Sequence, residues 1–171
     1  MTIAASYDTK DWKPENAQAN MAQAISEIGK NNIAGVYSAN DGMAGGVIKA
    51  LKAAGVTSLP PITGQDAELD AVQRIVAGEQ YMSVYKSYPT EAETAAEMAV
   101  AKVQGKDIQF DSLTRDKVSS PTNKDVPSQL VSVVALTKNN IKDTVIADGI
   151  YKVSDICTAR YRSACVAIGL R

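Results

Sequence analysis

The sequence predicts an α/β fold built on a doubly wound parallel sheet. Short β-rich apolar segments alternate with helical segments of about ten to fifteen residues, which is the spacing of right-handed β-α-β crossovers. Three apolar segments end in polar motifs: Ser-Ala-Asn-Asp-Gly at residues 38–42, Gly-Gln-Asp at 64–66 and Tyr-Lys at 85–86. Parallel strands deliver such groups to one edge of the sheet, where open α/β folds bind ligands.

The composition limits the classes of function. With 171 residues, of which 45% are hydrophobic, the chain is long enough for one ordinary core and too short for two comfortable domains. A net charge of -1 argues against nucleic acid or an anionic membrane as a partner. The absence of histidine excludes a Ser-His-Asp triad, a Cys-His dyad and a histidine-ligated zinc or iron site. No segment resembles a signal peptide or a membrane span, so we expect a soluble chain without a leader.

The first elements follow from periodicity and capping residues. Residues 2–6 form a short predicted strand, and residues 7–12 form the loop after it. A helix is expected over 14–30, because a proline is tolerated in a first turn and apolar residues recur every three or four positions. Residues 33–37 predict a buried strand, and residues 42–54 a helix whose small residues allow close packing on a sheet.

The alternation continues through the middle of the chain. Residues 60–64 predict a third strand, residues 67–77 a third helix with an apolar inner face, and residues 82–85 a fourth strand. Because the second, third and fourth predicted strands run parallel, the polar motifs at their ends share one edge of the predicted sheet.

After residue 86 the pattern loosens. An amphipathic helix over 90–104 has no obvious partner surface within this chain. Residues 108–125 are largely polar and contain an irregular loop. A strong strand at 129–136 and a short helix at 139–148 complete the series.

Three polar side chains at the strand ends are candidate ligand contacts. Asn40 or Asp41 is suited to cap the helix that follows, and Asp41 can cap while Asn40 offers a carbonyl acceptor and an NH2 donor to a ligand. Taken alone, Asp66 could also be an N-cap and Lys86 a solvated surface lysine. The coincidence of Asn40, Asp66 and Lys86 at one predicted sheet edge favours a ligand site.

Trp12, the lone tryptophan, lies between two charged residues in the loop after the first predicted strand, outside any periodic apolar run. An aromatic plane beside an amide, a carboxylate and an ammonium suits a sugar, whose C–H face packs on the ring while its hydroxyls bond the polar groups. Asp66 would accept from two hydroxyls, Lys86 would donate, and Asn40 would do both. Because no nucleophile–base pair accompanies these residues, we expect binding without catalysis and without a cofactor or metal.

The two cysteines, Cys157 and Cys165, lie close together in the sequence. A straight strand would separate their Cα atoms by about 26 Å and a straight helix by about 12 Å, both beyond the roughly 5.5 Å of a disulfide. A bridge therefore requires the segment to fold back on itself. A small disulfide loop would suit an oxidising compartment, and two free thiols are the alternative.

Seven motifs closely resemble the D-xylose-binding proteins of ABC import systems, which are type I periplasmic sugar-binding proteins. These motifs are WKPENA at 12–17, ANDGMAGG at 39–46, GQDAEL at 64–69, VQRIVAG at 72–78, VYK at 84–86, DVPS at 125–128 and NNIKDTVI at 139–146. In that family the tryptophan matching Trp12 stacks against the pyranose, and the residues matching Asn40, Asp66 and Lys86 bond sugar hydroxyls. The segment from Asp155 to Cys165 is similar to the extension of actinobacterial members, which are exported and often lipid-anchored.

The resemblance covers only the C-terminal half of a two-lobed protein. It implies that residues 1–87 and 137–156 form the incomplete sugar-binding C-terminal lobe of a periplasmic-binding-protein type I fold. Residues 88–136 would hold the hinge crossings and elements that pack on the missing N-terminal lobe, and residues 157–171 would be a C-terminal extension. We expect this half to have lost the hinge closure that gives tight binding.

The resemblance also implies a role and partners. The chain would be part of the solute-binding component of an ABC sugar importer, which is not an enzyme. Its partners would be a monosaccharide, D-xylose or a related pentose or hexose, ABC permease subunits, and the missing lobe or a second copy of the chain. The full-length form would be periplasmic or extracellular and membrane-anchored as a lipoprotein.

Two other classes of protein compete with this interpretation. The effector domain of a LacI-type transcription regulator shares the fold and the strand-end site, but it would be accompanied by a helix-turn-helix and a basic headpiece, and neither is present. A small doubly wound enzyme would need a catalytic group or a glycine-rich phosphate loop after the first strand. The Tyr-Asp-Thr-Lys sequence at residues 7–10 is not such a loop.

Overall fold

The structure is a computed structural model that describes residues 2–171. The chain divides into two units. Unit 1 comprises the chain up to Tyr85 together with Val134–Arg171, and unit 2 comprises Lys86–Val133. Among the described residues, no helix is both long and apolar enough to cross a membrane.

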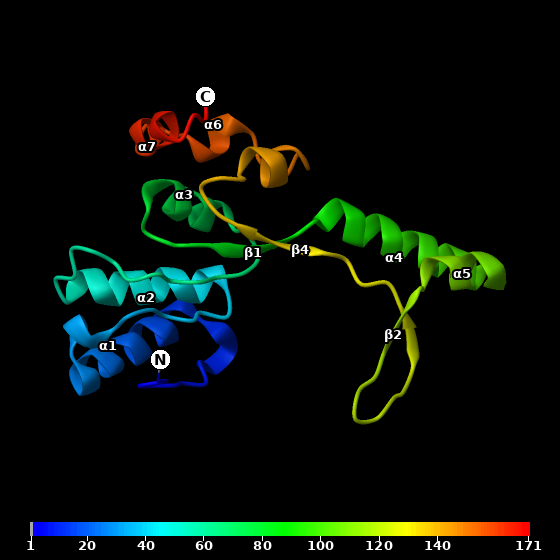
Figure 1. Ribbon diagram of the computed structural model, residues 1–171, viewed down its shortest axis with the longest axis horizontal. Coiled ribbons are helices and arrows are strands. Elements are labelled where there is room, and N and C mark those ends of the chain that lie inside the picture. Colours follow the sequence, from blue (N-terminus) through cyan, green and yellow to red (C-terminus); the bar gives the residue numbers. More distant parts are fainter. Residues whose placement is uncertain (1) are drawn as a thin grey trace. The chain divides into compact units, whose positions relative to one another are not determined.

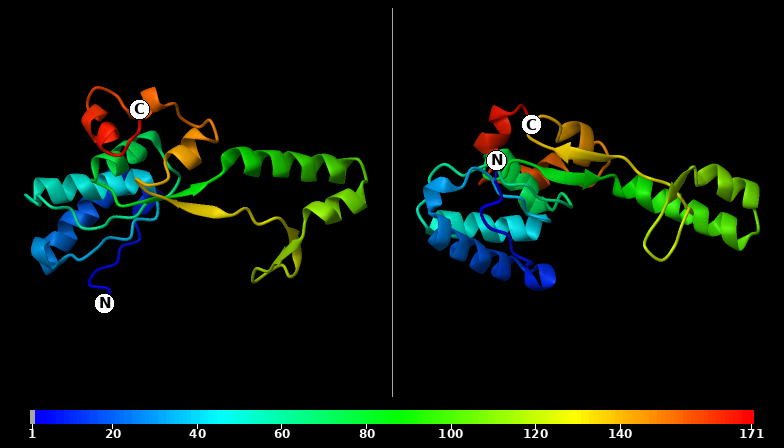
Figure 2. Two further views of the ribbon diagram at one scale, coloured as in Figure 1. Left: turned by 45° about the horizontal axis from the view of Figure 1, so that its top comes forward. Right: turned by 60° about the horizontal axis from the view of Figure 1, so that its bottom comes forward.

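Unit 1 contains the helices that the sequence predicts most strongly. They are α1 (Pro14–Ile28), α2 (Asp41–Ala53) and α3 (Leu69–Ala77), followed by the short helices α6 (Val153–Ile156) and α7 (Arg162–Ala167). The helix predicted over 139–148 is a single π-helical turn, η3 (Lys142–Ile146). Helices α1 and α2 lie side by side in every view, while α3, α6 and α7 gather on the other side of strand β1 (Ser83–Lys86) (Figures 1 and 2).

The sheet of unit 1 is built from short pairings. Val36 pairs in parallel with Ile62, and Gln65 pairs in parallel with Val84 of β1. Strand β1 is hydrogen-bonded to β4 (Val133–Leu136), and the arrows of the two strands point in opposite directions (Figure 1). The mixed helix and strand content confirms the α/β class.

Four strand predictions need correction. Residues 2–6 form no strand, and Ile3 is 89% exposed, so no neighbour covers an apolar face there. Residues 33–37 are not a buried strand: without a partner on their outer side they form one bridge, and Tyr37 is 85% exposed. Residues 60–64 also form only a bridge, since the two prolines at their start cannot donate to a ladder. In the segment 129–136, only residues 133–136 form a strand, β4.

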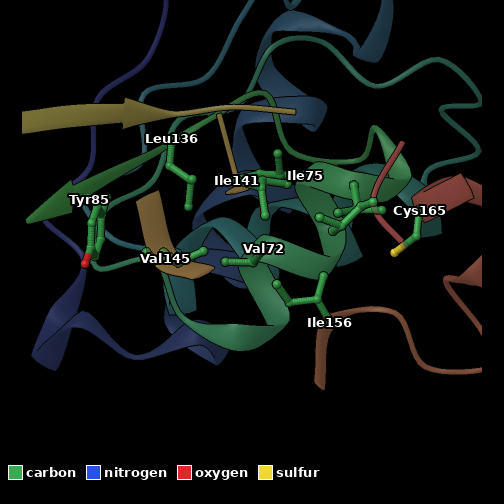
Figure 3. Packing of buried hydrophobic residues seen from close by; sticks show 11 residues of the cluster. Val72, Ile75, Tyr85, Leu136, Ile141, Val145, Ile156 and Cys165 are labelled. Atoms are coloured by element: carbon green, nitrogen blue, oxygen red, sulfur yellow. The ribbon is translucent and has the colours of Figure 1, made fainter. Parts of the chain in front are cut away.

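Two hydrophobic clusters hold unit 1 together. One joins α1 and α2 to Ile62, with Met43 and Leu51 among its buried members. The other surrounds α3 and includes the residues labelled in Figure 3: Val72, Ile75, Tyr85, Leu136, Ile141, Val145, Ile156 and Cys165. Both clusters include residues of the strand-end motifs or their immediate neighbours, such as Met43 in the first cluster and Ala67 and Tyr85 in the second.

The C-terminal segment belongs to unit 1. Cys157 and Cys165 form a disulfide with Cα atoms 5.9 Å apart. Cys165 and Leu170 are buried in the second cluster, and the side-chain amide of Gln73 in α3 donates to the main-chain oxygen of Asp155 at 3.0 Å. The segment after Cys157 therefore contributes buried side chains to this core.

Unit 2 contains α4 (Tyr88–Val103), which matches the amphipathic helix predicted over 90–104. A second helix, α5 (Asp107–Leu113), lies where the sequence suggested only polar chain. Strands β2 (Asp116–Val118) and β3 (Val126–Ser128) form an antiparallel pair around the predicted irregular loop.

Candidate ligand-binding site

The parallel pairings bring strand ends of unit 1 to one edge of the sheet. Val36 and Ile62 are paired, so Asn40 and Asp66 each follow a strand segment that runs in the same direction. The main-chain N–H of Asp41 donates to the oxygen of Gln65 at 3.0 Å, which ties these two ends together. Lys86 is the last residue of β1 and is half-buried.

Asn40 is the N-cap of α2. Its Oδ1 accepts from the N–H of Met43 at 3.0 Å, and its backbone is extended, as a cap requires. Of the two capping residues that the sequence left open, the structure uses Asn40, so the alternative in which Asp41 caps and Asn40 is left for the ligand does not hold. Asn40 caps with its oxygen and keeps its Nδ2 hydrogens as donors.

Asp66 lies in a turn of unusual backbone conformation and does not cap the next helix. The φ angle is 95° at Asp66 and 51° at Ala67, values that L-residues rarely adopt. Helix α3 begins at Leu69 with Glu68 as its N-cap residue, so the alternative of Asp66 as an N-cap does not hold. Successive positive φ angles in non-glycine residues cluster at ligand clamps and active sites.

Three loops meet beside the first turn of α2. A Cβ atom placed on Gly42 would lie 3.5 Å from Cγ of Pro14, 3.8 Å from Oε1 of Glu68 and 3.9 Å from Nδ2 of Asn40. Trp12 precedes Pro14 by two positions and Asp66 precedes Glu68 by two. The structure therefore brings the segments that carry Trp12, Asn40 and Asp66 to one place.

Trp12 closes a short 3-10 turn, η1 (Lys10–Trp12), just before α1. Its φ angle is 54° and its side chain is 56% exposed. The turn is fixed by the side-chain amide of Asn16, which donates to the main-chain oxygen of Lys10 at 2.8 Å. An exposed indole held by a constrained turn presents an apolar face to solvent.

Asp41, directly after Asn40, is completely buried. Its Oδ1 accepts from Nε2 of Gln80 at 2.8 Å, and its Oδ2 accepts from the hydroxyl of Ser83 at 2.7 Å and from the N–H of Glu68 at 3.0 Å. Burial raises the pKa of Asp41, while these hydrogen bonds and the charge of Arg74 oppose the shift. Sequence reasoning missed this role.

Glu68 is a second residue that sequence reasoning missed. Desolvation of its carboxylate, followed by the charge of Asp41, raises the pKa of Glu68, and Arg74 opposes the shift. Asp66 and Asp70 add further negative charge nearby. The sequence did hold one indication that Glu68 lies near the site, because it follows Asp66 by two residues in the same motif. Within residues 2–171, no group of three or more acidic or cysteine residues is arranged to hold a metal ion.

A family model described as a periplasmic binding protein domain matches residues 1–107. The chain belongs to the periplasmic binding protein family. The match includes α1, α2, α3 and β1 of this family member, and with them the segments that meet beside Gly42.

Relatives of this periplasmic binding protein domain carry sugar names. It is 43% identical over 145 residues to the D-xylose-binding periplasmic protein of Escherichia coli, and 39% identical over 145 residues to the protein of the same name from Haemophilus influenzae. Both alignments cover 85% of this chain and 42% of the relative. A multiple sugar-binding periplasmic receptor from Rhizobium radiobacter is 32% identical over 153 residues, which is 86% of this chain and 42% of that protein. The chain thus spans 42% of the length of these relatives.

Solved structures show the same fold. An ABC transporter solute binding protein from Clostridium phytofermentans with bound β-D-glucose superposes with a TM-score of 0.71 at 29% identity, covering 85% of this chain and 44% of that one. A carbohydrate transporter solute binding protein from Chloroflexus aurantiacus, in complex with D-glucose, gives a TM-score of 0.69 at 28% identity, covering 85% and 42%. The fold is therefore that of the type I periplasmic binding proteins.

Proposed function

We propose that this chain carries half of a monosaccharide site and is part of the solute-binding component of an ABC sugar importer, with D-xylose as the first candidate ligand. The observation that carries the proposal is the 43% identity, over 85% of this chain, to a protein named for D-xylose binding. A further relative, 32% identical over 149 residues, is named a xylitol-binding protein, which supports a five-carbon sugar or its sugar alcohol as the ligand class.

The chemistry of the meeting loops supports a sugar. The exposed ring of Trp12 would pack on the C–H face of a pyranose, and the carboxylate of Asp66 would accept from hydroxyls. Because Oδ1 of Asn40 caps α2, this residue would face the sugar mainly as a donor through Nδ2. Lys86, at the end of β1, would be a second donor. Binding by these groups needs no cofactor and no catalytic step.

The division into units supports the proposed half-site. In this proposal unit 1 is the sugar-binding lobe, and unit 2 holds the hinge crossings and the elements that would pack on a first lobe or on a second copy. Val103 at the end of α4 is 88% exposed and Ile108 in α5 is 90% exposed, which fits surfaces that another lobe covers.

The relatives are named periplasmic, which supports an exported location for the full-length protein. A lipid anchor and a contact with ABC permease subunits are part of the same proposal. Fractionation of the source cells with an antibody against unit 1 would test the anchor. We expect the protein in the membrane fraction, and its release into the soluble fraction when lipoprotein acylation is blocked.

A 15N NMR titration of this chain with D-xylose tests the sugar site. We expect amide resonances near Trp12, Asn40 and Asp66 to move, with L-xylose as the matched control sugar. Asp66→Asn should weaken binding about tenfold, which is the loss of one hydrogen bond to a charged acceptor. Asp70→Asn removes an exposed carboxylate from α3 and should leave binding unchanged. The proposal is wrong if no resonance moves at the highest soluble sugar concentration.

A further inference from the structure

The turn that presents Asp66 is held by bonds from outside it. Positive φ angles at Asp66 and Ala67 are disfavoured, so the turn needs external contacts to persist. Three consecutive amides supply them, each donating at 3.0 Å: Asp66 N–H to the main-chain oxygen of Val84, Ala67 N–H to Oγ of Ser83, and Glu68 N–H to Oδ2 of Asp41. No local sequence signal fixes this turn, which instead depends on β1 and on Asp41.

Asp41 contacts the turn on both sides. Its main-chain N–H donates to the oxygen of Gln65, the residue before Asp66. Its carboxylate accepts from the N–H of Glu68, the residue after Ala67. The hydroxyl of Ser83, which holds the Ala67 amide, also donates to Asp41 Oδ2 at 2.7 Å. One buried residue therefore contacts both ends of the turn, the first end through its main chain and the second through its side chain, which also bonds the neighbouring strand.

The hydrogen bonds that reach Asp41 have a fixed direction. Arg74 can only donate, and its Nε donates to Oε1 of Gln80 at 3.0 Å. The orientation of the Gln80 amide is therefore set, and its Nε2 must face an acceptor, which is Oδ1 of Asp41 at 2.8 Å. Arg74 also donates through Nη2 to the main-chain oxygen of Asp41 at 2.8 Å. An asparagine at position 41 would place one NH2 group against another donor.

We propose that Asp41 is a positioning residue of the ligand site, which, together with Ser83 and Gln80, fixes the backbone conformation in which Asp66 meets the ligand. Asp41 is completely buried and does not itself touch a ligand. The same residue follows the N-cap Asn40, so one anchor sets the position of two ligand-facing groups. The ligand part of this proposal rests on the proposed sugar-binding function, and the turn part does not.

A pair of variants separates positioning from mere loss of stability. Asp41→Asn should weaken the turn, because in either orientation its NH2 group meets a donor, Nε2 of Gln80 or the N–H of Glu68, and the orientation that suits Gln80 removes the bond to Glu68. Adding Gln80→Glu restores complementarity: the introduced glutamate accepts from Arg74 and from the amide of the introduced asparagine, and the net charge of the pair is kept. Recovery should be partial, since Nε2 of Gln80 also donates to the main-chain oxygen of Met82 at 3.1 Å, a bond that glutamate cannot make.

Hydrogen exchange of the ligand-free chain tests the turn independently of any sugar. In Asp41→Asn we expect the amides of residues 66–68 to exchange about tenfold faster or more, while amides in α1 keep wild-type rates. The double variant should recover most of the protection. Ser83→Ala is the second variant if Asp41→Asn does not fold, and it should accelerate the Ala67 amide.

The D-xylose titration completes the test. Asp41→Asn should weaken binding about tenfold, and the double variant should restore most of it. If the wild-type chain does not bind D-xylose, the proposed function fails. The exchange data still show whether Asp41 holds the turn at residues 66–68. Unchanged exchange at residues 66–68 in Asp41→Asn and Ser83→Ala, or a double variant no better than Asp41→Asn, overturns the positioning role.

Discussion

The close contact between α1 and α2 leads to opposite predictions for two glycines of the same helix. A Cβ at Gly46 would overlap the main-chain oxygen of Pro14, and it would lie 2.9 Å from the carbonyl carbon of Pro14 and 3.1 Å from the main-chain nitrogen of Gln18. Main chain cannot rotate away as a side chain can. A Cβ at Gly42 would meet nothing closer than 3.5 Å, which is ordinary van der Waals contact.

Gly46→Ala should therefore destabilise the chain although alanine is the better helix former. Overpacking costs about 3 kcal/mol and the helix preference returns about 1 kcal/mol, so the free energy of unfolding should fall by about 2 kcal/mol. For a chain of this size, Tm should fall by about 4–8 °C. Gly42→Ala, in the first turn, should gain about 0.5 kcal/mol and raise Tm by about 1–2 °C.

Urea denaturation followed by far-UV circular dichroism measures both variants, with thermal melts as a second probe. The wild-type chain and Gly42→Ala are the controls, since each variant adds one methyl group to helix α2 of the wild type and the two variants differ only in its position. A Gly46→Ala protein as stable as the wild type would refute the close approach of α1 to α2.

Three further predictions concern stability. The pKa of Asp41 is raised above its ordinary value of 3.8, and that of Glu68 above 4.5, so just above these values the folded chain binds more protons than the unfolded one. The free energy of unfolding should therefore fall as the pH rises through this window, and Asp41→Asn should flatten the curve measured by urea denaturation across acidic pH. Replacing Cys157 and Cys165 by serine opens a loop with a separation of 8 residues and should cost about 2.5 kcal/mol in the same assay, whereas an unchanged midpoint would contradict the chain-entropy account. Ile75→Ala removes a completely buried side chain from the α3 cluster and should cost about 2–5 kcal/mol, and a loss below that of an exposed-site control would contradict the packing of Figure 3.

Sequence periodicity located the helices that bury one face. Helices α1, α2 and α3 each have buried residues at helical spacing, and their predicted and observed ranges agree closely. Helix α5 was missed because it has no buried residue, so no apolar stripe marks it. Strand predictions failed where a neighbour is lacking, as at Tyr37, because a strand is defined by its partners as well as by its own residues.

The candidate site shows a different limit of sequence reasoning. Proximity of Asn40 and Asp66 follows from strand order, which the alternating pattern predicts. The sequence left the cap open between Asn40 and Asp41, because two adjacent residues of capping type do not show which side chain points at the helix and which points into the core. That direction depends on Gln80 and Ser83, which lie 39 and 42 positions away in the sequence.

The division of the chain makes unit 2 an insertion in unit 1. The chain leaves unit 1 through β1 and returns through β4, and these strands are hydrogen-bonded neighbours that run in opposite directions. Unit 2 therefore joins two neighbouring strands in the way that a long loop would, with its two ends held next to each other. Replacing that loop by about six flexible residues would lower the entropy cost of closure by about 2 kcal/mol. Unit 1 is thus discontinuous in sequence, yet a short linker is enough to join its two parts.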